Sequence, residues 1–122
     1  MIMKKNSKKI IFNHFAIEVF VFPDDGKDHT ISCCGDEATL DGTTAGMCCE
    51  GDRNKPFALM FRRGGDPTVV AHEVWHLFFK ILRHMTGSDH QDYVTYGDLE
   101  GEIYAYRFSD LFDLVMNTLK GL

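Results

Sequence analysis

The sequence has no apolar run near the roughly 20 residues that a membrane-spanning helix needs. It also lacks an excess of basic residues. Its 13 lysines and arginines stand against 18 aspartates and glutamates, for a formal net charge of −5. This balance argues against a protein that binds nucleic acid by neutralising phosphates. There are no internal repeats, low-complexity tracts or linkers, so we expect one domain over residues 1–122, with neither a membrane nor a nucleic-acid partner.

The N-terminal segment does not predict a signal peptide. The lysine-rich start is followed by a short apolar run, but Asn13 and Glu18 interrupt the apolar character and no small-residue cleavage site follows. The basic cluster fits a flexible tail over residues 1–9. The sequence therefore predicts a cytoplasmic protein.

The four cysteines form two adjacent pairs and lack the Cys-x-x-Cys spacing of a zinc knuckle. Adjacent residues on a strand point to opposite faces, so neither pair can easily share one metal. Disulfides between two strands and a second metal site remain alternatives, and we expect reduced thiols. The residues concerned are Cys33, Cys34, Cys48 and Cys49.

Apolar segments alternate with turn-forming residues in the first half of the chain, and longer helical patterns follow. The predicted fold class is α+β. We expect strands at about 15–22, 30–34, 43–49 and 56–61, and helices at about 67–86 and 98–119.

The first predicted helix contains His-Glu-x-x-His at His72, Glu73 and His76. Positions i and i+4 stack on one helix face, so both imidazoles can bind one metal ion. Glu73 sits beside that face, where a general base can reach a water on the metal. Asp66 and Pro67 resemble a helix start, and Gly87 resembles a stop. The same residues also fit a core helix that binds no metal.

A catalytic zinc site usually has a third protein ligand. The extended pattern His-Glu-x-x-His-x-x-Gly-x-x-His is excluded because Phe79 and Leu82 occupy the Gly and last His positions. His84 lies too far along the same helix. The third ligand must therefore come from another element.

The two motifs together resemble the glutamate-zincin metallopeptidases, and most closely small phage and prophage proteins of zincin type. Thr68 to His76 matches the first motif and Glu102-Ile103-Tyr104-Ala105-Tyr106 matches the second. The resemblance covers residues 44–119 and implies a short mixed sheet of three to four strands packed on two main helices. It implies Glu102 as the third ligand, with Glu100 and Asp98 as rivals. It also implies an edge strand beside the metal that holds an extended peptide, either residues 43–49 or residues 30–34.

These motifs predict a zinc-dependent peptidase that acts on a peptide or protein substrate, with Zn²⁺ as cofactor and Glu73 as general base. Candidates for oxyanion or substrate contacts are Tyr106, Tyr96, His90 and Arg107. The alternative is a metal-containing phage or mobile-element protein that binds a host partner without catalysis. The intact Glu73 favours the enzyme, because a purely structural site needs no base.

The expectation that the cysteines lie outside the zinc site can be tested by replacing all four with serine. We expect the zinc content, measured by elemental analysis, to stay at about one per chain, as in the unmodified protein. Loss of one equivalent of zinc would show that the cysteines hold a metal.

Overall fold

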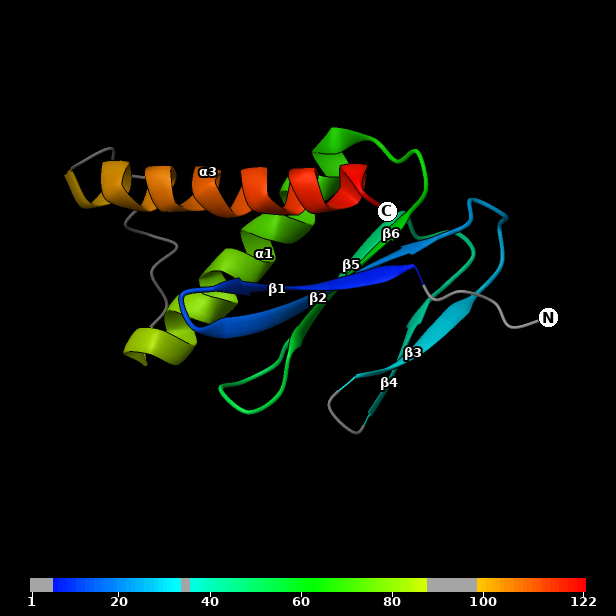
Figure 1. Ribbon diagram of the computed structural model, residues 1–122, viewed down its shortest axis with the longest axis horizontal. Helices are drawn as coiled ribbons and strands as arrows, with labels where there is room; N and C mark the ends of the chain where they lie inside the picture. Colours follow the sequence, from blue (N-terminus) through cyan, green and yellow to red (C-terminus); the bar gives the residue numbers. More distant parts are fainter. Residues whose placement is uncertain (1–5, 34–35, 88–98) are drawn as a thin grey trace.

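The computed structural model describes residues 6–33, 36–87 and 99–122. Figure 1 shows two helices lying over one face of a sheet, with a small second sheet on the other side. The α+β class and the mixed sheet with two helices are confirmed. The elements are β1 (Ser7–Phe12), β2 (Phe15–Phe22), β3 (His29–Cys33), β4 (Asp36–Leu40), β5 (Gly46–Cys49), β6 (Phe57–Arg62), α1 (Pro67–Thr86) and α3 (Leu99–Lys120).

The main sheet has the strand order β1-β2-β6-β5. Its central strands, β2 and β6, run parallel, and β1 and β5 pair with them antiparallel at the two edges. All six residues of β6 are buried, as expected for a strand covered on both faces. Strand β5 forms one edge of the four-stranded sheet, and it is the strand that packs most closely against α1.

Alternate residues of the central strands serve two separate cores. Val19, Leu59 and Phe61 face the helices, whereas Phe20 and Met60 face the opposite side. The hairpin of β3 and β4 covers that opposite side with Ile31 and Leu40. On the helix side, an aromatic cluster joins α1 to α3, with the Phe108 ring centroid 5.5 Å from that of Trp75 and 5.9 Å from that of Phe78.

Strand β1 corrects the sequence-based expectation of a flexible tail over residues 1–9. Ser7–Phe12 pairs with β2 along its whole length. Of the expected tail, residues 1–5 lie outside the described residues. Asn13 and His14 form the two-residue turn with φ values of 49° and 68°. Positive φ at both positions matches a type I′ hairpin turn. Such turns usually contain glycine, and because this one has none, the sequence did not predict it.

Helix α1 begins and ends at the expected residues. The Asp66 side chain accepts a hydrogen bond from the Thr68 amide at 2.9 Å, and Pro67 occupies the first turn. At the other end, Gly87 has φ 76° and its amide donates to the Arg83 carbonyl at 2.7 Å. These caps satisfy backbone groups that a helix end leaves free. Of the helices in the described part of the chain, none is long and apolar enough to cross a bilayer.

Arg62 organises the loops at the end of β6. Its side chain is only 6% exposed, and it forms an ion pair with Asp25 at 3.2 Å. The rest of its hydrogen bonds go to backbone carbonyls in the loops after β2 and β4. Those carbonyls belong to Pro23, Lys27, Asp41 and Thr44. One buried cation therefore ties two loops to the strand that leads into α1.

We expect Arg62→Met to lower the free energy of unfolding by about 3 kcal/mol, because it leaves several carbonyls without their charged donor. Arg63→Met is the matched control, since the Arg63 side chain is exposed and donates a hydrogen bond to the Leu122 carbonyl. Urea denaturation of both variants measures the difference. Equal destabilisation by the two substitutions would contradict this role of Arg62.

Candidate metal centre

The face of α1 that presents His72 and His76 points away from the core. His72 and His76 are exposed, while Val74 and Leu77 on the opposite side are completely buried. The two imidazole rings are nearly perpendicular, at 83°, with centroids 4.7 Å apart. Their Nε2 atoms lie 3.1 Å from each other. The helix thus brings one nitrogen of each ring to a common point.

This spacing fits a shared metal ion. Two nitrogens bound to one zinc ion at about 2.0–2.1 Å in tetrahedral geometry lie about 3.3 Å apart. A hydrogen bond between two imidazoles would have a similar length, so the spacing alone does not identify the ion. The set of donors adds to it, because ligand atoms of His72, Glu73 and His76 all lie within 4.8 Å of one another. Within the described residues these three form a group that can hold a metal ion.

Glu73 differs from the two histidines because it is buried, with 8% of its surface exposed. Its stem packs against Gly46 at the start of β5. A Cβ added at Gly46 would lie 3.2 Å from the Glu73 Cγ and 2.8 Å from the Val69 Cγ1. The groups that approach Gly46 most closely are therefore side chains of α1 and β6. A side chain at position 46 would press on the carboxylate that follows His72.

Cys48 lies on the same side of β5 and packs against the helix-side core. Burial, reinforced by the Glu73 charge and opposed by that of Lys80, raises the pKa of the Cys48 thiol to about 12. The thiol is therefore protonated at neutral pH, which disfavours metal binding and nucleophilic attack. Within the part of the chain that the structure describes, Cys48 and Cys49 form no disulfide. Cys34 and the side chain of Cys33 lie outside the described residues.

A second contact holds the far end of β5 against α1. The Glu50 carboxylate accepts hydrogen bonds from Arg83 at 2.6 Å and from His84 at 2.9 Å. Burial alone would raise the pKa of Glu50, but the His84 hydrogen bond and the Arg83 charge outweigh it and hold that pKa below its usual value. Together with the packing at Gly46, this contact aligns β5 with the length of α1 that contains the candidate metal site. No local sequence pattern predicts this contact, because Glu50 is more than 30 positions away from Arg83 and His84.

The other predicted site residues are placed only in part. Tyr106 is 71% exposed on α3. Arg107 instead contacts the β1–β2 hairpin: it donates to the Asn13 side chain, and its guanidinium lies 5.1 Å from the Phe12 ring centroid.

The remaining candidates fall outside the description. His90, Tyr96 and Asp98 lie outside the described residues. Glu100 and Glu102 are on α3, but their side chains also lie outside the described residues.

No protein-family model matches the sequence, and no curated protein or solved structure matches it. The His-Glu-x-x-His group on α1 is therefore the feature on which an assignment of function must rest.

We expect His72→Ala and His76→Ala each to abolish zinc binding, because either change removes one of two converging nitrogens. Zinc at a hundred times its Kd should stabilise the unmodified protein by about 2.7 kcal/mol, and this gain should vanish in both variants. Elemental analysis and thermal melts with and without zinc measure the two effects.

His84→Ala is the matched control on the same helix, since His84 is bound to Glu50 instead. It should retain zinc. Full zinc occupancy in His72→Ala and His76→Ala would contradict the site.

Proposed function

We propose that the protein is a zinc-dependent peptidase of the glutamate-zincin type, related to small phage proteins. The observation that carries the proposal is the convergence of the His72 and His76 Nε2 atoms, 3.1 Å apart, beside the buried carboxylate of Glu73. A site that only stabilised the fold would need the two nitrogens but not an acid next to them.

In this proposal His72 and His76 would hold a zinc ion, which would supply Lewis-acid activation of the scissile carbonyl and of the attacking water. Glu73 would accept the proton of the attacking water and later donate it to the leaving amine. Packing against Gly46 limits the positions that the Glu73 side chain can adopt. The base is therefore held ready before the substrate binds.

Glu102 is the proposed third ligand, with Glu100 and Asp98 as its rivals. Helix α3 packs against α1 through Phe108, so α3 is a neighbour from which a ligand can come. Tyr106, Tyr96 and His90 remain candidates for the donor that stabilises the oxyanion. Arg107 is a weaker candidate, because it is already bound to the β1–β2 hairpin.

Strand β5 is the proposed substrate-binding edge. It lies at the end of the strand order, and its first residue, Gly46, touches Glu73. An extended peptide can pair with such an edge through main-chain hydrogen bonds. Strand β3 is less suitable, because it belongs to the separate two-stranded sheet on the opposite side.

We expect Glu73→Gln to retain zinc and the fold but to lose hydrolysis by at least about a hundredfold, because the amide keeps the shape and removes the base. Cleavage of a peptide library, followed by mass spectrometry, measures the loss.

Glu37→Gln is the control, since it removes an exposed carboxylate on β4, which belongs to the separate two-stranded sheet. Its activity should stay within about threefold of the unmodified protein. Unchanged turnover in Glu73→Gln would mean that another group transfers the proton. Absence of cleavage by the zinc-loaded unmodified protein would favour a non-catalytic partner-binding role.

A further inference from the structure

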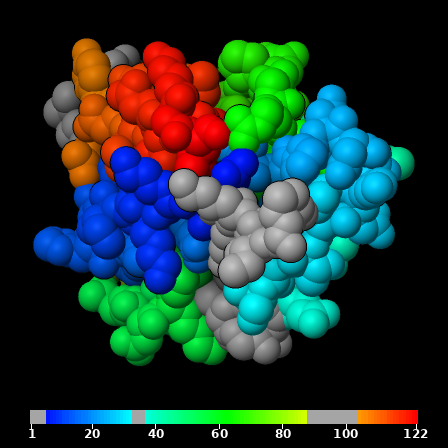
Figure 2. All heavy atoms as spheres, turned by 45° about the vertical axis from the view of Figure 1, so that its right-hand side comes forward, coloured from blue at the N-terminus to red at the C-terminus, as the bar shows by residue number. Residues whose placement is uncertain are grey.

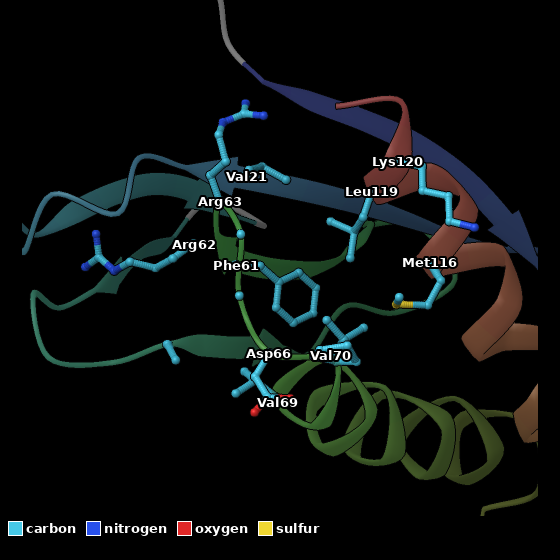
Figure 3. Close-up of a pocket in the computed structure, with 14 residues that line it drawn as sticks. Val21, Phe61, Arg62, Arg63, Asp66, Val69, Val70, Met116, Leu119 and Lys120 are labelled. Atoms are coloured by element: carbon cyan, nitrogen blue, oxygen red, sulfur yellow. The ribbon is translucent and has the colours of Figure 1, made fainter.

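A cavity of about 220 Å³ opens beside the start of α1 (Figure 3). It lies where the last turns of α3 meet the ends of β2 and β6, and Figure 2 shows the red end of α3 beside the green start of α1. Its walls are mainly apolar. The larger apolar side chains in its walls are those of Val21, Phe61, Val69, Val70, Met116 and Leu119.

The size of this cavity selects the kind of group it can hold. An apolar cavity of about 150 Å³ holds benzene. Sites for drug-sized ligands usually measure about 300–1,000 Å³. A cavity of about 220 Å³ therefore fits one apolar side chain, such as that of leucine, better than a large ligand.

The charges at the margin favour a negative group. Lys120 and Arg63 lie along one margin in Figure 3, and Lys120 is exposed and forms no ion pair with any described residue. Asp66 lies on the opposite margin, where its carboxylate caps α1. Arg62 borders the cavity, but its guanidinium points away from it toward the loops that it binds.

The cavity is also close to the candidate metal centre. Val69 and Phe61 line it, and both would touch a Cβ added at Gly46, as would Glu73. Val69 and Glu73 are four residues apart, so they share a helix face and lie about 6 Å apart along the axis. An extended peptide advances about 3.3–3.6 Å per residue. The distance from Val69 to Glu73 along the helix therefore corresponds to the length of about two residues of an extended peptide.

We propose that this cavity binds the apolar C-terminal residue of a peptide, with the side chain inside and the terminal carboxylate beside Lys120. The inference rests on the proposed peptidase function and narrows it to cleavage near the carboxyl end. Water is added across one peptide C–N bond: the longer fragment gains a carboxylate, and the released residue or dipeptide gains an amine.

The test measures binding by calorimetry, with zinc-loaded Glu73→Gln protein so that the probes stay intact. The probes are N-acetyl-Ala-Ala-Ala-Leu as free acid, the same peptide as C-terminal amide, the free acid ending in serine, and octanoate. We expect the amide to bind about fivefold more weakly than the acid, because it cannot form the exposed ion pair with Lys120. The serine peptide should bind at least tenfold more weakly, because it buries no apolar side chain.

Two variants in that background locate the binding. Lys120→Glu should abolish the preference for acid over amide, while the control Lys8→Glu, an exposed lysine on β1, should preserve it. Met116→Trp should fill the cavity and abolish the preference for leucine over serine. Circular dichroism checks that each variant folds, and Lys120→Gln replaces Lys120→Glu if the latter does not.

Equal binding of acid and amide, unchanged preferences in the two cavity variants, or binding of octanoate without the leucine peptide would overturn the proposal. Binding of the leucine acid with the expected preferences, but no hydrolysis by the unmodified protein, would reject the peptidase and keep the cavity assignment. Hydrolysis of internal bonds without any preference at the carboxyl end would reject the cavity assignment and keep the peptidase.

Discussion

The fold depends on how α1 is held between the core and solvent. One side of the helix buries Val74, Leu77 and Ile81 completely, and the aromatic contacts with Phe108 fix it to α3. Because those contacts set the rotation of the helix about its axis, the opposite side must present His72 and His76 outward. The caps at Asp66 and Gly87 fix where the helix begins and ends. The histidine geometry thus follows from packing on the other side of the helix.

Strand β5 packs beside the candidate metal site. Gly46 makes room for the Glu73 and Val69 side chains, and Glu50 binds the last turn of α1. Between these two points Cys48 packs against the core and helps to seal the side of the sheet next to Glu73. Packing at Gly46 limits the movement of the Glu73 side chain, which suits the proton-transfer role that we propose for it.

Much of this could be predicted from the sequence because it is local. Helix α1 was predicted with its observed bounds, since a proline follows its cap and a glycine follows its last turn. Strand β2 has the predicted bounds, because its apolar run ends at a proline. Strand β1 was missed because two adjacent exposed lysines, Lys8 and Lys9, precede the buried Ile10 and Phe12, and because no glycine marks its turn. The role of Arg62 was also missed, since its partners come from two loops that only the folded chain brings together.

The proposed zinc site is tested most directly by the atoms that surround the bound ion. X-ray absorption at the zinc edge, recorded on the purified protein, measures those atoms and their distances. We predict nitrogen and oxygen neighbours at about 2.0–2.2 Å, with the outer-shell scattering of two imidazole rings. Sulfur neighbours at about 2.3 Å, or a protein that takes up no zinc, would contradict the assignment of His72 and His76 as the metal ligands.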